Sequence, residues 1–434
     1  MEQREHFSAI EIDHRQMVMA IEATVDLVGM NDTSHGKQVG YIATQLAHLL
    51  KMDESQIEFL FELGLLHDCG VSSDQVHGQL VNHFDWEDAH IHCEIGYQLL
   101  KDFEPLAEYA TPILYHHTAW DELQQQDLDP LMVRYANLIF LADRIDMMSA
   151  AHYGNDILIY RRQVLEGIQG FSGRYFDPEL VAAFEQLQPS EAFWIALEDR
   201  HIIRFSWDMG RHSHKHPMSL QQLKQLARML SYIVDQKSPF TAQHSTRVAI
   251  LSRYLAEQMG LTEEQIDKIE VAGYLHDLGK LRTPDQILDK PGKLTERERA
   301  IMVQHSFETY EILRQIDGLD EIARWAAYHH EEMNGHGYPF HLDRKEIAVE
   351  ARLIAVADVF QALVQDRPYR PGMSLEKVIE ILDQFVEQQK LAPNIVEIAK
   401  QHAERCYVIA RGEAEENVGN EVLVMVDALE AAGR

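Results

Sequence analysis

The chain has 434 residues, a formal net charge of −31 and three cysteines. This length allows two or three domains that each bury a core. The negative charge argues against binding to nucleic acid polymers or anionic membranes, whose phosphates the protein would repel. No apolar run is long enough to cross a membrane, and residues 1–30 carry charges throughout. We therefore predict a cytoplasmic protein without membrane insertion.

Helical apolar patterns dominate the chain, so we predict an all-α fold. The best strand candidate is His201–Trp207, and the polar segment that follows, residues 209–217, is predicted to be a linker between domains 1–208 and 218–434. The acidic stretch from Glu413 is predicted to be a peripheral helix. The clearest predicted helices are Gln56–Leu66, Leu220–Val234, Glu263–Leu275, Glu296–Ile312 and Leu375–Glu387.

Seven residues of metal-binding types occur twice in the chain, in the same order. The first histidine precedes a His-Asp pair by 32 positions in both halves (67 − 35 and 276 − 244), and the third precedes a His-His pair by 24 (116 − 92 and 329 − 305). Apolar residues repeat at the same offset, so the fold is predicted to be duplicated too. The first set is His35, His67, Asp68, His92, His116, His117 and Asp143, and the second is His244, His276, Asp277, His305, His329, His330 and Asp358.

The number and type of these residues predict a centre with two divalent metal ions. Five histidines and two aspartates exceed the four ligands of a zinc-type site. Mixed nitrogen and oxygen ligands suit Mn or Fe better than Mg or Ca, with Zn and Ni as further options. Such a centre binds a phosphoryl group and activates water, which points to phosphoester hydrolysis. Cys69 and Cys93 lie beside these residues in sequence, and we interpret them as buried packing residues.

Further motifs of the second half resemble the HD-GYP phosphodiesterases. Residues 276–280 are HDLGK, residues 329–339 are HHEEMNGHGYP, and residues 366–370 are DRPYR. The resemblance covers about residues 220–401. It implies two tandem helical domains of the HD superfamily, the second of HD-GYP type, and hydrolysis of a bacterial cyclic dinucleotide at a metal centre.

The resemblance also implies roles for individual residues. One metal ion would be held by His244, His276 and Asp358, the other by His305, His329 and His330, with Asp277 bridging both. Asp277 and Lys280 would be catalytic, with Lys280 beside the attacked phosphate. Arg367 and Arg370 are candidate phosphate ligands, with surface salt bridging as the alternative. Gly337, Tyr338 and Pro339 would form a substrate-binding lip, with simple packing as the alternative for Tyr338.

Three positions depart from the family pattern. Members with three metal ions carry Glu four residues before the first histidine, where this chain has Phe240, so we expect two metal ions. Asn334 and Gln361 replace residues that are usually Asp. Both changes affect hydrogen bonds that orient ligands, which leaves rate and substrate preference open.

The first half resembles a degenerate HD domain. It keeps all seven candidate ligands but has Val71 where the second half has Lys280, and it lacks the GYP and DRPYR motifs. Three interpretations follow: a metal-binding regulatory or structural module, an inert packing domain, or a phosphohydrolase with another substrate. The first half has lost the cationic residues but has kept the candidate metal ligands. This favours the metal-binding regulatory or structural module.

Together these features predict a metal-dependent phosphodiesterase. It would open cyclic di-GMP or 3′,3′-cyclic GMP-AMP to a linear 5′-phosphorylated dinucleotide, and further hydrolysis to mononucleotides is open. The alternatives are a cyclic-dinucleotide receptor without turnover and an HD-superfamily nucleotide phosphohydrolase. A homodimer and signalling-protein partners are compatible with the sequence.

Overall fold

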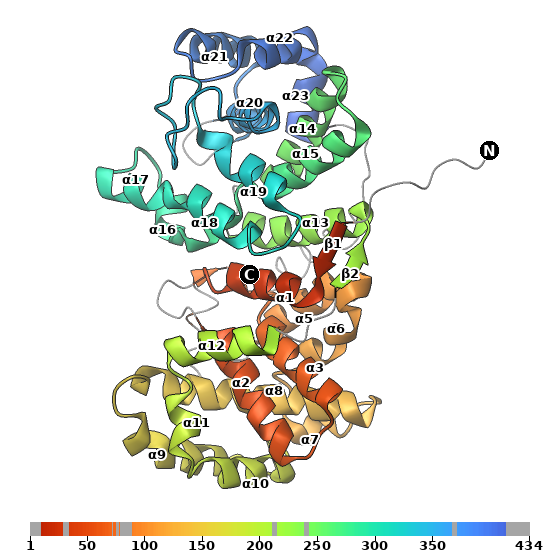
Figure 1. Ribbon diagram of the computed structural model, residues 1–434, viewed down its shortest axis with the longest axis vertical. Coiled ribbons are helices and arrows are strands. Elements are labelled where there is room, and N and C mark those ends of the chain that lie inside the picture. The colour runs from red at the N-terminus through yellow and green to blue at the C-terminus, as the bar shows by residue number, and fades with distance from the viewer. Residues whose placement is uncertain are drawn as a thin grey trace, which may run out of the picture. The chain divides into compact units, whose positions relative to one another are not determined.

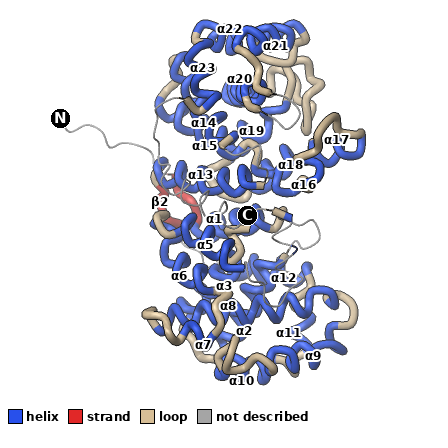
Figure 2. The backbone as a smooth tube through the Cα atoms, turned by 180° about the vertical axis from the view of Figure 1, so that it is seen from behind, coloured by secondary structure: helices blue, strands red, loops and turns tan. Residues whose placement is uncertain are grey.

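The described residues form helices almost throughout. The computed structural model describes residues 10–28, 34–71, 73–74, 78, 89–210, 215–237, 243–366 and 371–413. They contain one sheet of two strands (Figures 1 and 2), so the predicted all-α fold is confirmed. Their contacts divide them into a C-terminal unit, residues 10–13 and 215–413, and an N-terminal unit, residues 14–210.

Two helices that cross at close range organise the N-terminal unit. At the crossing of α2 and α3, a Cβ added to Gly64 would lie 2.5 Å from the Gly40 Cα. The missing side chains allow this approach. It brings His35, which begins α2, to His67, which follows α3, with 5.1 Å between the ring centres. The elements of this unit are α1 (His14–Val25), α2 (His35–Leu49), α3 (Glu54–Leu66), α5 (Ala89–Leu100), η1 (Glu104–Leu106), α6 (Ala107–Tyr115), α7 (Trp120–Leu123), α8 (Pro130–Ser149), η2 (Ala150–His152), α9 (Ile157–Gln169), α10 (Pro178–Leu187), α11 (Glu191–Ile195) and α12 (Asp199–Gly210).

The C-terminal unit repeats this arrangement with α14 and α15. Gly273 of α15 lies against Ala249 of α14, and the rings of His244 and His276 are 5.2 Å apart. The elements of this unit are β1 (Ile10–Asp13), β2 (Lys215–Met218), α13 (Leu220–Gln236), α14 (His244–Gln258), α15 (Glu263–Leu275), η3 (Leu278–Arg282), α16 (Asp285–Leu288), α17 (Glu296–Met302), α18 (Gln304–Leu313), α19 (Asp320–Ala327), η4 (Tyr328–His330), α20 (Val349–Val364), α21 (Leu375–Glu387), α22 (Pro393–Gln401) and α23 (Ala403–Arg411).

The predicted strand His201–Trp207 is wrong, because these residues belong to helix α12. Ile202 and Ser206, four residues apart, are buried, and the ring of Phe205 packs edge-on against Tyr41 of α2 at 5.0 Å. Trp207 is exposed, as a helix with Ile202 and Ser206 on its buried face requires. Seven residues were too few to distinguish this helical pattern from the alternation of a strand.

Part of the predicted linker has regular structure. Met209 and Gly210 end α12, and residues 215–217 lie in β2, which pairs antiparallel with β1 near the N-terminus. Strand pairing satisfies backbone groups, so a segment without apolar periodicity can still be ordered. Residues 211–214 lie outside the described part.

The other predicted helices differ from the observed ones mainly in one place. The predicted helix Glu296–Ile312 is divided at Val303 into α17 and α18, whereas Glu263–Leu275 and Leu375–Glu387 have the observed bounds. None of the described helices is both long and apolar enough to span a bilayer. The stretch predicted to form a peripheral helix lies, after Glu413, outside the described residues.

Candidate metal centres

Six of the seven candidate ligands of the C-terminal unit come from helix ends and turns, and the seventh, Asp358, comes from the interior of α20. The crossing of α14 and α15 brings the first histidine to the His-Asp pair, and α18, η4 and α20 surround that pair with the remaining ligands. All lie in groups whose donor atoms are within 4.8 Å of one another. The groups are His244, His276 and Asp358; His276, Asp277 and His329; and His305, His329 and His330.

Backbone carbonyls fix the orientation of three of the imidazoles. Nδ1 lies 2.7 Å from Gly273 O in His276, 2.7 Å from Met302 O in His305, and 2.6 Å from Ala326 O in His329. A carbonyl oxygen only accepts hydrogen bonds, so Nδ1 is the donor in each ring. In the neutral rings, Nε2 therefore directs a lone pair toward the other ligands, as a metal-binding histidine requires.

Asp277 lies between two groups of imidazoles. Its Oδ2 is 3.3 Å from Nε2 of both His244 and His276, whereas its Oδ1 is 3.6 Å and 3.8 Å from Nε2 of His305 and His329. Each carboxylate oxygen thus faces a different group. This is the arrangement expected of a carboxylate that bridges two cations.

The separations between the imidazoles match shared ligation of a cation. Two nitrogens bound to one tetrahedral ion at about 2.0–2.1 Å lie roughly 3.4 Å apart. The Nε2 atoms of His244 and His276 are 3.3 Å apart, and those of His305 and His329 are 3.5 Å apart. Lone pairs at such distances repel each other unless a cation or a proton lies between them. The residues present therefore fit two divalent metal ions.

Burial and local charges determine the protonation of the candidate ligands. Burial lowers the pKa of His305 to about 4 and that of His330 to about 3, so these rings are neutral. Burial opposes a charge on Asp277, but His276 and Lys280 hold its pKa well below the usual range. His244 differs, because the carboxylates of Asp277 and Asp358 outweigh burial and raise its pKa to about 9.

Gln361 performs the hydrogen bonding expected of the aspartate that it replaces. Its Oε1 accepts a hydrogen bond from His244 Nδ1 at 2.6 Å, which leaves Nε2 directed at the other ligands. The amide side chain is fully buried, and its Nε2 has no hydrogen-bond partner among the described residues. A neutral amide orients the imidazole as a carboxylate does, but it makes the ring a less basic ligand.

Lys280 extends from η3 to the bridging carboxylate. Its Nζ lies 2.5 Å from Asp277 Oδ2, and its side chain is 22% exposed. The ammonium group of Lys280 therefore lies at the edge of the ligand cluster, where a substrate that enters from solvent can reach it.

The predicted lip is a loop held by Glu331. The buried carboxylate of this residue accepts hydrogen bonds from the backbone N–H of Phe340 at 2.7 Å and of Leu342 at 3.0 Å. Gly337 lies so close to this turn that an added Cβ would be 2.4 Å from the Glu331 Cα. The Tyr338 ring lies 4.7 Å from that of His330, so it covers a candidate ligand. The bond between Tyr338 and Pro339 is cis.

Asn334 fits the same loop. Its Oδ1 accepts from the His336 backbone N–H at 2.8 Å, as an aspartate would, while its Nδ2 donates to Gln388 O at 3.2 Å. The second bond needs an amide. Arg367 and Arg370, the candidate phosphate ligands, and Phe240 lie outside the described residues.

The N-terminal unit contains a second cluster with the same plan. Asp68 Oδ2 is 3.8 Å from His35 Nε2 and 3.6 Å from His67 Nε2, and Asp68 Oδ1 is 3.3 Å from His92 Nε2 and 3.8 Å from His116 Nε2. The candidate ligand groups are His35, His67 and Asp143; and Asp68, His92, His116 and His117. These residues too fit two cations.

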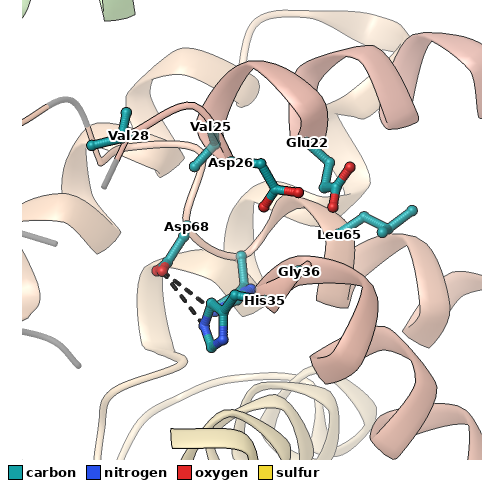
Figure 3. Close-up of a pocket in the computed structure, with 9 residues that line it drawn as sticks. Glu22, Val25, Asp26, Val28, His35, Gly36, Leu65 and Asp68 are labelled. Atoms are coloured by element: carbon teal, nitrogen blue, oxygen red, sulfur yellow. Dashed lines mark ion pairs between the residues drawn. The ribbon is translucent and has the colours of Figure 1, made fainter. Parts of the chain in front are cut away.

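The surroundings of this second cluster are less suited to an anionic substrate. Figure 3 shows a pocket beside His35 and Asp68 that the carboxyl groups of Glu22 and Asp26 line. Lys37 is an ion-pair partner of both Glu22 and Asp26. Val71, which replaces the lysine of the other unit, is fully buried.

Sequence patterns missed several residues that shape these sites. Gly70 and Gly279 follow the His-Asp pairs, and an added Cβ would lie 2.1 Å from the backbone oxygen of His92 or His305. The recurrence of His-Asp-x-Gly in both halves could have revealed them. Asp235 accepts a hydrogen bond from Ser245 at the start of α14, and no sequence motif indicated this role.

Comparisons with known proteins agree with this architecture. Models of the HD domain match residues 33–148 and 228–395. A crystal structure described as a cyclic GMP-AMP specific phosphodiesterase of V. cholerae, V-cGAP3, matches with a TM-score of 0.63 and 24% identity, covering 91% of this chain and 98% of that chain. The fold and the clusters thus define a protein with two HD domains.

Relatives of similar sequence specify the family. The 3′3′-cGAMP-specific phosphodiesterase 1 of Vibrio cholerae is 36% identical over 408 residues, which are 93% of this chain and 95% of that protein. The cyclic di-GMP phosphodiesterase response regulator RpfG of Xanthomonas campestris is 40% identical over 164 residues, 37% of this chain and 42% of that protein. The chain belongs to the HD-domain family of cyclic dinucleotide phosphodiesterases, which confirms the predicted family and enzyme class.

Proposed function

We propose that the C-terminal unit hydrolyses a phosphodiester bond of a cyclic dinucleotide at a centre of two divalent metal ions. The observation that carries this proposal is the position of Asp277, whose two oxygens face different groups of histidines. Metal ions held there would supply a nucleophilic water and neutralise charge on the phosphate. Addition of water at phosphorus with departure of the 3′-oxygen gives a linear dinucleotide with a 5′-phosphate.

The protein's own groups would orient and stabilise the reacting phosphate. Lys280 has a flexible ammonium group beside Asp277 and can turn toward a phosphate oxygen. In this proposal, it stabilises charge that develops on the phosphate. Gly337 and Tyr338 form the lip, and Arg367 and Arg370 remain proposed phosphate ligands from outside the described residues.

We propose 3′,3′-cyclic GMP-AMP as the first substrate to test. The relative whose name states this specificity aligns over 95% of its own length and over both halves of this chain. RpfG aligns over 164 residues. Cyclic di-GMP is the second candidate.

The metal identity and the role of the N-terminal unit complete the proposal. Fe or Mn is the preferred occupant of the C-terminal centre, with Ni and Zn as alternatives, because the ligands mix imidazole and carboxylate. The N-terminal unit is proposed to bind metal without hydrolysis. A cytoplasmic location is supported by three buried thiols without disulfides.

The deciding experiment separates the three candidate functions. The full-length protein is loaded with Mn(II) or Fe(II) and incubated with each cyclic dinucleotide or, separately, with linear nucleotides, and the products are identified by chromatography and mass spectrometry. A linear 5′-phosphorylated product that the Asp277→Asn variant does not form supports the proposal. Binding without any product would identify a receptor. Hydrolysis of linear nucleotides alone would indicate a phosphohydrolase instead.

A further inference from the structure

Cys93 lies beside the N-terminal ligand cluster. It follows His92 in α5, is fully buried, and its Sγ lies 3.7 Å from His92 Nε2. The same nitrogen lies 3.3 Å from His116 Nε2 and 3.3 Å from Asp68 Oδ1. The sulfur thus lies beside a ring nitrogen that is itself close to two other candidate ligand atoms.

This distance is the one expected for two ligands of a single ion. Bond lengths of about 2.3 Å to sulfur and 2.0–2.1 Å to nitrogen at a tetrahedral angle separate the two atoms by roughly 3.5 Å. The observed 3.7 Å between Cys93 Sγ and His92 Nε2 requires only a small adjustment. Asp68 independently indicates a cation at this position, because its Oδ1, which lies 3.3 Å from His92 Nε2, is buried and has no hydrogen-bond partner among the described residues.

We propose that Cys93 is a thiolate ligand of the metal ion that His92 binds, within the group of candidate ligands Asp68, His92, His116 and His117. On metal binding, the thiol transfers its proton to solvent and the sulfur forms a bond to the cation. Cys93 is then a ligand rather than the packing residue that the sequence suggested. The proposal does not depend on hydrolysis in the C-terminal unit.

The C-terminal unit has a serine at the matching position. Ser306 follows His305 as Cys93 follows His92, and its Oγ lies 3.2 Å from His305 Nε2. A hydroxyl keeps its proton at neutral pH and is a weak ligand, whereas a thiolate prefers ions such as Zn(II), Fe(II) and Co(II) over Mn(II) and Mg(II). The two centres are therefore expected to select different metals, with the softer ion in the N-terminal unit.

Cobalt tests the sulfur ligand without any measurement of activity. The full-length protein is stripped of metal with a chelator and titrated with Co(II) without oxygen, while thiolate-to-cobalt charge transfer is followed in the near ultraviolet. The wild-type protein should develop this band, and Cys93→Ser should lose at least about nine-tenths of it. An unchanged band in Cys93→Ser, or no band in cobalt-loaded wild type, overturns the proposal.

A second variant tests the proposal even if Cys93→Ser does not fold. The chain has three cysteines, so in the double variant Cys69→Ser, Cys406→Ser any thiolate band must come from Cys93. Retention of the wild-type band supports the proposal, and its loss overturns it. Circular dichroism and the thermal midpoint of each variant establish that the compared proteins are folded.

Discussion

Replacement of Lys280 by valine would give the C-terminal centre the residue that the N-terminal unit has at Val71. Lys280 Nζ is 2.5 Å from Asp277 Oδ2, and its side chain is 22% exposed. A unit charge about 4 Å from a phosphate oxygen contributes up to about 4 kcal/mol at an effective dielectric constant near 20. Partial exposure reduces this contribution, so we expect kcat to fall by about 10²–10³-fold.

The metal content should respond differently from the rate. The ammonium group competes with cations for Asp277 Oδ2, so Lys280→Val should bind metal at least as tightly as the wild type. Initial rates on cyclic dinucleotide and the metal content after gel filtration are measured in parallel. Lys268→Val is the matched control, because Lys268 pairs with Glu264 and Glu321 outside the cluster. A wild-type rate, or a rate that falls only in proportion to lost metal, would refute the role of Lys280.

Three further predictions follow from the same geometry. Asp277→Asn should lose turnover and lower the metal content of the C-terminal centre, measured by elemental analysis, and full activity with two bound ions would exclude a bridging carboxylate. Gln361→Ala should weaken metal binding by about 10–100-fold because His244 Nδ1 loses its acceptor, and Gln361→Asp should restore it; equal affinities in a metal titration would contradict this. Burial raises the pKa of Asp235 from 3.8 to about 7. In metal-free protein, ionisation of this carboxyl group therefore lowers the free energy of unfolding by up to about 4 kcal/mol as the pH rises from about 4 to 7. Asp235→Asn should therefore unfold at a higher temperature relative to wild type at pH 8 than at pH 5, and a difference independent of pH would exclude the effect.

The position of the candidate site was predictable because most of its ligands lie at helix ends. The interval of 32 residues spans helices of equal length in the two halves, since α2 and α14 have 15 residues each and α3 and α15 have 13 each. The interval of 24 residues is also equal, although α5 has 12 residues and α18 has 10. Thr262 illustrates the local basis, since its side chain accepts from Gln265 N and begins α15 where the sequence predicted. A cap and an apolar period together define a helix, and the helix defines where His276 lies.

Other features depend on contacts that spacing does not encode. In α12, Ile202 and Ser206 face the core while Trp207 is exposed, and this choice of helix over strand requires knowledge of α2. The sequence showed an amide at Gln361 but not that its oxygen still accepts from His244. The direction of the Cys93 thiol is likewise set by packing of α5, and adjacency in sequence favoured neither a ligand nor a core residue.

The differences between the two clusters lie in the groups around the metal ligands. Both units keep the aspartate between two groups of imidazoles, but Val71 replaces the cation that Lys280 supplies. Converging imidazole lone pairs in a buried site are unfavourable without a cation. In the N-terminal unit, the buried Arg144 guanidinium lies 2.8 Å from Asp143 Oδ2 and neutralises part of the carboxylate charge. A unit that no longer bound metal would gain stability from apolar residues at these positions. The retained ligands around Asp68 therefore support metal binding in the N-terminal unit independently of catalysis.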